Sequence, residues 1–241
     1  NYTRFAGNTK GEREELRVES CLRHPCGDFT AKNIESAEKM RKGNARKIYL
    51  ASKSPRRREL LERVGIPFEV VERDSVPLPK FDPENPADYA IKLALAKAKA
   101  AKAPDDAIVL GCDTIVVQRL KLLEKPADET QAKYFLTRLA DDWHQVFTGI
   151  ALYEPSTGRE ESDCEMTRVH FGPLSEEEID AYIATGEPMD KAGAYGIQEK
   201  GALLIREIRG DYFNVVGLPL FRLTVLLARF NIFVENLIEC G

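Results

Sequence analysis

The stretch AIVLGCDTIVV, residues 107–117, decides the fold of this chain. Nearly all of its residues are apolar or β-branched, which is typical of a β-strand covered on both faces and therefore of a sheet with helices packed on each side. One acid, Asp113, interrupts the run beside Thr114. Because a buried carboxylate is costly unless it binds a cation or accepts hydrogen bonds, we interpret Asp113 as functional. The alternative is an acid that caps a turn at the end of a strand.

A strand followed by a helix precedes this segment, in residues 47–65, KIYLASKSPRRRELLERVG. Residues 47–51 favour a strand, Ser54 suits the N-cap of a helix, Pro55 suits its first position, and Gly65 suits its end. Three arginines, residues 56–58, fall in the first helical turn. Cations are unusual there, whereas bound anions are favoured by the helix dipole and by free N–H groups. The segment therefore predicts an anion site, with a capped helix and a solvated basic face as the alternative.

Strands and helices alternate through the rest of the chain, which predicts an α/β or mixed α+β architecture. Ser175 and Glu178 form the pattern of a capping box at one helix start. Residues 73–86, rich in Pro and Asp, are expected to form an irregular loop. Helices are predicted at residues 86–102, 128–139, 174–185 and 219–230, and further strands at 67–72, 145–153, 163–171, 202–208 and 214–216.

One domain is expected over residues 47–233, with an N-terminal tail over residues 1–46 and a C-terminal tail over residues 234–241. The N-terminal stretch has no sustained hydrophobic period and begins without Met. It contains Cys21, His24 and Cys26 in the run CLRHPC. Three ligands so crowded, without a partner pair, fit a zinc site poorly.

The composition excludes several classes of protein. Five cysteines without regular spacing in 241 residues argue against a secreted disulfide framework, so we expect a reducing, cytoplasmic environment. No apolar run is long enough to span a membrane. A net charge of −4 and only 8% aromatic residues discourage a polynucleotide-binding module. Because such a chain repels polyphosphates at long range, a phosphate site must be a local cluster of cations and backbone N–H groups.

Common catalytic motifs are missing. The sequence contains no GxxxxGK[ST] phosphate loop, no GxGxxG, no HExxH and no GxSxG. His144 and His170 are too isolated for a metal cluster, and Cys112 is most simply a core residue. Lys125, in Leu123-Glu124-Lys125-Pro126, follows a short hairpin that could bring it back towards Asp113, although a lysine beside proline is more often plain surface.

Seven segments, in this order, resemble the Maf family, also called septum-formation inhibitors, over roughly residues 47–230. The resemblance implies a mixed twisted sheet flanked by helices in two lobes with a central cleft, as in Maf and ITPase-like proteins. It also implies homodimers, a divalent metal, and hydrolysis of a nucleoside triphosphate to the monophosphate and pyrophosphate. The segment AGAYGIQ is similar to the corresponding segment of the family branch that acts on dTTP and UTP. The segments are LASKSPRRRELLERVGIPFEVV, KLALAKAKA, VLGCDTIVV, LEKPAD, HQVFTGIAL, LSEEEIDAYIATGEPMDKAGAYGIQEKGALLI and GDYFNVVGLPL.

The same resemblance implies roles for single residues. Asp113 matches the general base of the family and a ligand of the metal, which would be Mg²⁺, with Mn²⁺ or Co²⁺ as alternatives. A set of cations and hydroxyls matches the phosphate path: Ser52, Arg57, Lys97 and Lys125, the last with a catalytic role. A second set matches positions linked to substrate selection: Arg56, Thr114 and Gln198. An amide such as Gln198 offers both donors and an acceptor to a uracil or thymine edge, although a backbone-bonded turn amide is an equally simple interpretation.

The sequence departs from the family pattern in one acidic loop. The family offers a candidate metal ligand after the second strand, where this chain reads DSVPLP, residues 74–79. Glu72, Asp74 or Asp82 are candidates to replace it. Two turns, at residues 118–121 and 140–143, also lack the usual glycine, which concerns turn geometry more than chemistry. The rival interpretation is therefore a nucleotide-binding regulator of cell division with little or no turnover.

Overall fold

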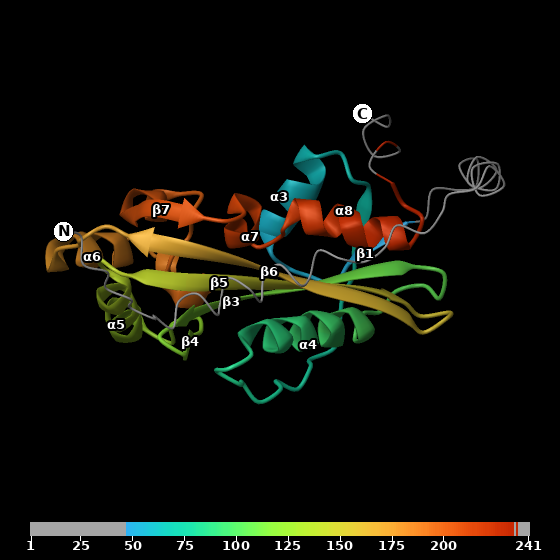
Figure 1. The fold of residues 1–241 in the computed structure, drawn as a ribbon, viewed down its shortest axis with the longest axis horizontal. Coiled ribbons are helices and arrows are strands. Elements are labelled where there is room, and N and C mark those ends of the chain that lie inside the picture. Colours follow the sequence, from blue (N-terminus) through green and yellow to red (C-terminus); the bar gives the residue numbers. More distant parts are fainter. Residues whose placement is uncertain (1–46, 234, 236–241) are drawn as a thin grey trace, which may run out of the picture. The chain divides into compact units, whose positions relative to one another are not determined.

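The computed structural model describes residues 47–233 and residue 235. The predicted tails lie outside the described residues, except for residue 235, and so do Cys21, His24 and Cys26. Seven strands of the described part form one mixed sheet (Figure 1). The strands are β1 (Ile48–Leu50), β2 (Phe68–Val70), β3 (Ile108–Gln118), β4 (Lys121–Leu123), β5 (Trp143–Glu154), β6 (Arg159–Phe171) and β7 (Ile205–Arg209).

The strand order is β2-β1-β3-β5-β6-β7, with β4 paired to β3 beside this path. β1 runs parallel to both β2 and β3, whereas all other pairs are antiparallel. The helices between the strands are α3 (Pro55–Arg63), α4 (Pro86–Lys99), α5 (Glu129–Leu139), α6 (Glu176–Ile183), α7 (Tyr212–Val216) and α8 (Leu220–Arg229). Three short 3-10 turns complete them: η2 (Glu187–Asp190), η3 (Ala192–Ala194) and η4 (Lys200–Leu204).

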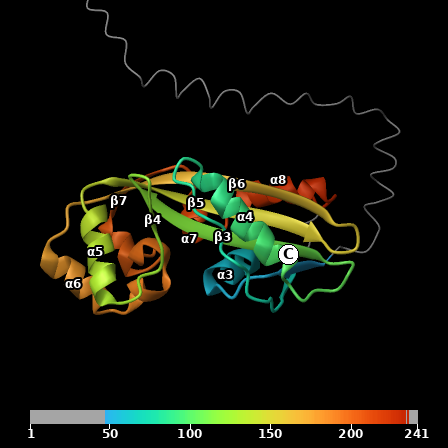
Figure 2. The same ribbon diagram turned by 90° about the horizontal axis from the view of Figure 1, so that it is seen from below.

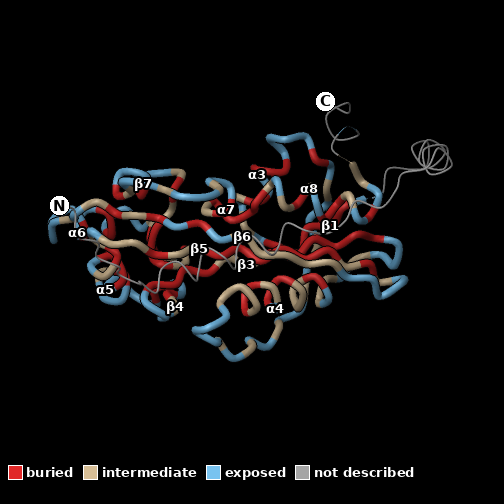
Figure 3. The backbone as a smooth tube through the Cα atoms, viewed as in Figure 1, coloured by how far each residue is buried: buried red, intermediate tan, exposed pale blue. Residues whose placement is uncertain are grey.

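Helices cover both faces of β3, as its apolar sequence predicts. Ile108 and Leu110 face a core shared with α3 and α8, whereas Val109 and Ile115 belong to the clusters on the opposite face, beside α4. Figure 1 shows α4 on one side of the sheet and α3 and α8 on the other. Most of β3 is buried accordingly (Figure 3). Because side chains alternate along a strand, one apolar run supplies both cores.

Two glycines let α4 lie unusually close to the sheet. A Cβ atom at Gly111 would collide with the carbonyl oxygen of Ala94, and one at Gly149 would collide with that of Ala90. Neither position needs a left-handed backbone. The glycines are therefore required by the contact itself, and they fix the depth at which α4 packs on β3 and β5.

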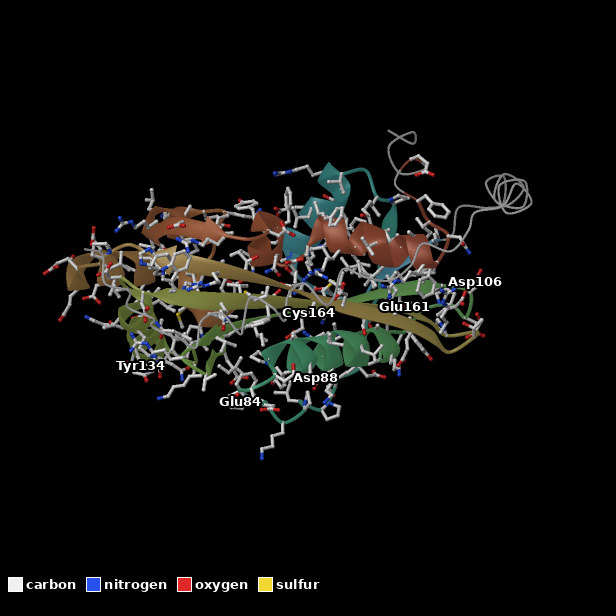
Figure 4. All side chains as sticks on the ribbon, viewed as in Figure 1. Glu84, Asp88, Asp106, Tyr134, Glu161 and Cys164 are labelled. Carbon is white, nitrogen blue, oxygen red and sulfur yellow. The ribbon has the colours of Figure 1, made fainter. Side chains whose placement is uncertain are left out.

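The helices gather at two ends of the sheet, which matches the expected two lobes (Figure 2). One end holds α3, α4 and α8. The other holds α5, α6 and the 3-10 turns around a second core, which includes Leu136, Phe171 and Tyr195. In Figure 4, Tyr134 marks α5 at one end and Asp106 marks the turn before β3 at the other.

Most predicted elements are confirmed, with shifted ends. The predicted strand at residues 214–216 is wrong, because this segment is the end of α7. Asp211 caps that helix by accepting from the Phe213 amide, and Gly217 ends it with a φ of 122°. β7 begins at Ile205, three residues later than predicted, because η4 occupies residues 200–204. The helix predicted to residue 102 ends at Lys99, since the Ala101 backbone bridges to Arg73.

The two predicted helix caps differ in outcome. Ser175 and Glu178 form a complete capping box at the start of α6. Ser54 occupies the N-cap position of α3 and Pro55 the first helical position, as predicted. Its side chain, however, makes no capping hydrogen bond there, and its backbone N–H instead donates to Oγ of Ser52 at 3.3 Å. The turn before α3 is thus held by Ser52 from the preceding loop.

Candidate active site

A gap in the sheet lies beside the middle of β3. On one side, β5 pairs with β3 continuously from Val109 to Val117. On the other side, β1 pairs with β3 only as far as Leu110, and β4 pairs with β3 only from Val116 onwards. Residues 111–115 therefore have no neighbouring strand on that side. Asp113 and Thr114 lie within this gap, which explains why they alone in β3 are only partly buried.

Asp113 is held by a lysine from α4. Oδ1 of Asp113 pairs with Nζ of Lys97, and both side chains are only 17% exposed. Burial lowers the pKa of Lys97 below its ordinary value, although the charge of Asp113 acts in the opposite direction. No other residue that the structure describes bonds to the Asp113 carboxylate. Its second oxygen is therefore available to a ligand or a water molecule.

The loop after β1 leads into α3 at the same gap, because β1 ends beside it. Arg57, in the first turn of α3, is buried and makes three hydrogen bonds. Nε donates to the Gly217 carbonyl at 2.8 Å, Nη1 to Oγ of Ser52 at 2.9 Å, and Nη2 to Oγ1 of Thr114 at 3.0 Å. Arg57 thus joins α3, β3 and the end of α7, and it brings a guanidinium charge to the gap.

A second arginine reaches the 3-10 turns of the other lobe. Nη1 of Arg56 lies 3.6 Å from Oδ2 of Asp190, which also pairs through Oδ1 with Nζ of Lys191 at 2.8 Å. Burial raises the pKa of Asp190, but the hydrogen bond and charge of Lys191, with the charges of Arg56 and Lys125, outweigh it. The net pKa lies below the ordinary value, so this carboxyl is ionised at neutral pH.

These residues line one cavity of about 170 Å³ between the lobes. Every site residue predicted from the sequence lines it except Ser52, which lies behind Arg57 and bonds to it. Lys125 forms no ion pair with any described residue, although its charge acts on Asp190 from a distance, so its ammonium group can bind a ligand. The principal lining residues are Ser54, Arg56, Arg57, Lys97, Asp113, Thr114, Lys125, Asp190, Lys191, Tyr195, Gln198 and Gly217.

A second cavity of about 170 Å³ adjoins the first and shares Lys97, Asp113, Thr114 and Lys125 with it. Its other walls are mainly apolar, and Glu124 and Tyr89 supply the only further polar side chains among the residues that line it. Burial, followed by the negative charges of Glu124 and Asp113, raises the pKa of the Tyr89 phenol. The cationic surface is therefore concentrated in the first cavity, with Asp113 at the junction of the two.

Sequence reasoning missed Asp190, Lys191 and Tyr195. Asp190 ends η2, Lys191 lies between η2 and η3, and Tyr195 directly follows η3. Such short 3-10 segments have no hydrophobic period from which the direction of a side chain could be predicted. The one available signal was the charged pair Asp190-Lys191 within the long run EPMDKAGAYGIQ. Glu124 was also missed as a wall of the second cavity, although it directly precedes Lys125.

The candidate replacements for the acidic loop do not line either cavity. Asp74 pairs with Lys102 at 3.0 Å, and Asp82 accepts from the Glu84 amide in a local turn. No group of three or more His, Cys, Asp or Glu residues suited to a metal occurs in residues 47–233 and 235. One or two carboxylates suffice to bind Mg²⁺ when phosphate oxygens and water molecules complete its coordination shell. Asp113 and Glu124, which line the same second cavity, therefore fit a cation that binds together with a phosphate ligand.

The fold and the cavity define a class of protein: an α/β protein with a cationic cleft built around one carboxylate. Comparison with known proteins is more specific. The Maf-like protein family matches residues 47–230, and the chain belongs to this family.

Curated relatives cover the same region. The dTTP/UTP pyrophosphatase of Bacillus cereus (strain ATCC 10987 / NRS 248) is 48% identical over 194 residues, which are 80% of this chain and 94% of the relative. The dTTP/UTP pyrophosphatase of Bacillus anthracis is 47% identical over 192 residues, 79% of this chain and 99% of the relative. Among solved structures, the Ham1 protein of Staphylococcus aureus aligns with 76% of this chain and 99% of its own, at 14% identity and a TM-score of 0.45.

Proposed function

We propose that this protein hydrolyses dTTP and UTP, and modified uridine triphosphates among their analogues, to the monophosphate and pyrophosphate. The observation that carries the proposal is Asp113, which is partly buried in a gap of the sheet, pairs with Lys97, and lines one cavity together with Arg56, Arg57 and Lys125. A carboxylate in such a place can activate water, and the cations can bind a polyphosphate. The curated relatives are dTTP/UTP pyrophosphatases, which supports the same reaction for this chain.

Asp113 is the proposed general base. Lys97 fixes one carboxylate oxygen and leaves the other free to orient a water molecule towards the alpha phosphorus. The water attacks phosphorus, its proton passes to Asp113, and the bond from the alpha phosphorus to the bridging oxygen breaks, so that pyrophosphate leaves.

The cations stabilise charge on the phosphates. Lys125 has no ion-pair partner among the described residues and is the proposed catalytic cation beside Asp113. Arg56 is only loosely paired with Asp190 and can turn to a phosphate oxygen. Arg57 keeps two N–H groups beyond its three protein bonds, and Ser52 holds its orientation. Such preoriented donors are worth most where charge develops in the transition state.

A divalent cation, with Mg²⁺ as the first choice and Mn²⁺ or Co²⁺ as alternatives, is the proposed cofactor. Asp113 would hold it, and Glu124 lines the adjoining cavity at a position to assist. When bound, such a cation supplies Lewis-acid stabilisation of the phosphate oxygens. The protein contributes the carboxylates and the surrounding cations.

Gln198 is the proposed reader of the base. It lies on the cavity wall beyond η3, in the same stretch as Tyr195 and Ile197, which offer an apolar surface to a flat ring. Its amide can pair with a uracil or thymine edge, where a donor and an acceptor lie side by side. With Arg56 and Thr114, it completes the proposed selection site.

The rival proposal is a nucleotide-binding regulator of cell division with little turnover. No acidic residue of the altered loop, residues 74–79, lines either cavity, and this observation favours the rival. Release of monophosphate and pyrophosphate from UTP, dTTP, CTP and 7-methyl-GTP, with Mg²⁺ or Mn²⁺, separates the two. Turnover of UTP or dTTP that is lost in Asp113→Asn supports the enzyme, whereas tight binding of these nucleotides without turnover supports the regulator.

We further propose a cytoplasmic homodimer with its catalytic domain in residues 47–233 and tails at residues 1–46 and 234–241. Phe221 and Val225 leave apolar surface exposed on α8, which supports association. In the described residues, no helix is long and apolar enough to cross a membrane. Light scattering coupled to size exclusion measures the mass directly, and a mass of one chain at micromolar concentration would contradict the dimer.

A further inference from the structure

Gln198 lies on a loop whose own backbone gives it little support. This loop, residues 195–199, joins η3 to η4 and belongs to no helix or strand; we call it the Gln198 loop. The Gln198 side chain lines the cavity but makes no hydrogen bond with any described residue. Its direction therefore depends on whatever fixes the backbone of the loop.

Two side chains, Tyr182 on α6 and Glu187 at the start of η2, bind three backbone amides around this loop. Oη of Tyr182 accepts from the Gly196 amide at 3.2 Å and donates to Oε1 of Glu187 at 2.8 Å. The Glu187 carboxylate also accepts from the amides of Lys200 and Gly201, each at 3.1 Å. Hydrogen bonds to an ionised acceptor are the stronger kind. The pair thus clamps the chain on both sides of Gln198.

The chemistry of each bond in the clamp depends on these two residue types. A backbone N–H can only donate, so the Tyr182 oxygen accepts from Gly196 and its own proton goes to Glu187. Burial, followed by the hydrogen bond to Glu187, raises the pKa of the Tyr182 phenol, so the hydroxyl keeps this proton at neutral pH. A phenylalanine would offer no acceptor, and a glutamine would turn an N–H group towards another donor.

Close packing shows that the two sides of the loop meet at the clamp. A Cβ atom at Gly201 would lie 2.3 Å from the Gly196 carbonyl oxygen and 2.6 Å from Oη of Tyr182. Neither glycine has a positive φ, so the contact itself requires the absence of a side chain at Gly201. The loop is therefore closed at its base, with Gln198 between the two closed sides.

We propose that Tyr182 and Glu187 are positioning residues that hold the Gln198 loop where the Gln198 amide meets the ligand. The proposal deepens the proposed function and rests on it, because it takes Gln198 as the residue that pairs with the base. Neither Tyr182 nor Glu187 lines either cavity, so both act only through the loop. Without the Tyr182 hydroxyl the Gly196 amide loses its acceptor, and a shift of about 1 Å is enough to misplace a positioned group.

The test compares UTP with N3-methyl-UTP, in which a methyl group blocks the ring nitrogen that Gln198 is proposed to pair with. The preference for UTP, expressed as the ratio of the two kcat/KM values, should fall about tenfold in Gln198→Ala, the worth of about one hydrogen bond. Tyr182→Phe keeps the ring, removes the hydroxyl and should lose the same preference. The double variant should lose no more than Gln198→Ala alone, since Tyr182 acts through Gln198. A merely structural role would lower both substrates alike and leave the ratio unchanged.

A second variant and a matched control sharpen the test. Glu187→Gln keeps the shape of the carboxylate, replaces one acceptor by a donor and should lose the preference as Tyr182→Phe does. Tyr134→Phe is the control, because this exposed hydroxyl on α5 accepts from Arg138 of the same helix and lies outside the clamp. It should keep the preference for UTP within about twofold of the unsubstituted protein.

Hydrogen exchange reports on the clamp without any turnover. Exchange of the Gly196 amide should speed up about tenfold in Tyr182→Phe and stay unchanged in Tyr134→Phe, because only the first variant removes its acceptor. If Gln198→Ala loses the preference for UTP whereas Tyr182→Phe and Glu187→Gln keep it, the positioning role is overturned and the proposed function stands.

Failure of the proposed function has a different signature. An unchanged preference in Gln198→Ala would show that Gln198 does not read the base, and would overturn both its selection role and the positioning role. If the unsubstituted protein turns over neither UTP nor dTTP, the preference is measured as affinity by calorimetry, with the α,β-methylene analogues of UTP and N3-methyl-UTP. A preference lost in both Gln198→Ala and Tyr182→Phe supports the positioning role in a binding protein, and a preference lost in Gln198→Ala alone overturns it.

Discussion

At the scale of single residues, Asp113 was the most predictable feature of the site. An acid within an apolar strand stands out because its burial needs a partner, and the structure supplies Lys97. Lys97 itself had no such signal, since helix residues 86–102 are rich in Lys and Ala throughout. Its direction depends on the depth at which α4 packs, which is a tertiary property.

Replacing Asp113 by asparagine should leave the fold intact and lower kcat by about 10²–10⁴, the range of a general base. The amide keeps the shape of the carboxylate but cannot take a proton. Pyrophosphate release measures the loss, and circular dichroism checks the fold. Activity near that of the unsubstituted protein would remove Asp113 from the role of base.

His144 should make the protein sensitive to acid. It is 2% exposed and its Nε2 lies 2.7 Å from the Tyr195 hydroxyl. Burial lowers the pKa of His144 from 6.5 to about 3. Its stabilising contribution is therefore complete above pH 6.5 and is lost as the pH falls towards 3, because the unfolded chain takes up the proton first. At pH 5 the linkage amounts to about 2 kcal/mol.

Chemical denaturation at pH 8 and pH 5 measures this effect. In His144→Gln, which keeps a polar group but cannot titrate, the loss of stability between the two pH values should be smaller by about 2 kcal/mol. An equal loss in the variant and the unsubstituted protein would show that His144 is not the group responsible.

At the scale of elements, the geometry of the site depends on the contact between α4 and the sheet, because α4 supplies Lys97. A Cβ at Gly149 would collide with the Ala90 carbonyl. Gly149→Ala should therefore push α4 outward, lower the free energy of unfolding by about 3 kcal/mol, and reduce activity by misplacing Lys97.

Gly172→Ala is the matched control, because a Cβ there would approach only the Leu204 carbonyl oxygen, at 4.0 Å, and Gly172 has no positive φ. Thermal unfolding and pyrophosphate release compare the two variants. Equal stability in both would contradict the close packing of α4.

The elements also show where sequence patterns fail. Residues 214–216 are Asn-Val-Val, and the two β-branched valines favour a short strand. They form the end of α7 instead, because the Asp211 cap and Gly217 define one helical turn and Asn214 is bound to β5 and β6. By contrast, Ser175 and Glu178 predicted the start of α6 correctly, since a capping box is a local interaction.

At the scale of the whole described domain, the site arises from an incomplete sheet. Both β1 and β4 pair with β3 on the same side, and the stretch between them, residues 111–115, is left without a partner. The sequence predicted the strand β1 and a short hairpin after β3, but not the strand β4 or that β1 and β4 pair on the same side of β3, because local sequence patterns do not determine which strands pair. The α/β class followed from alternating elements, whereas the cleft depended on this topology.

A nucleotide that bridges the two ends of the domain should stabilise it as a unit. With Asp113→Asn to prevent hydrolysis, saturating UTP and Mg²⁺ at about 100 times the dissociation constant should add about 2.7 kcal/mol to the free energy of unfolding. Thermal shift measures the gain, with ATP as the control nucleotide. No shift with UTP, or an equal shift with ATP, would contradict a pyrimidine site in the cleft.

The most direct test of the central claim is product analysis of UTP hydrolysis in the presence of Mg²⁺, with ¹⁸O-labelled water. The proposed attack at the alpha phosphorus predicts UMP that carries one ¹⁸O atom and pyrophosphate that carries none, with both products lost in Asp113→Asn. Release of inorganic phosphate and UDP, or label in the pyrophosphate, would contradict the account.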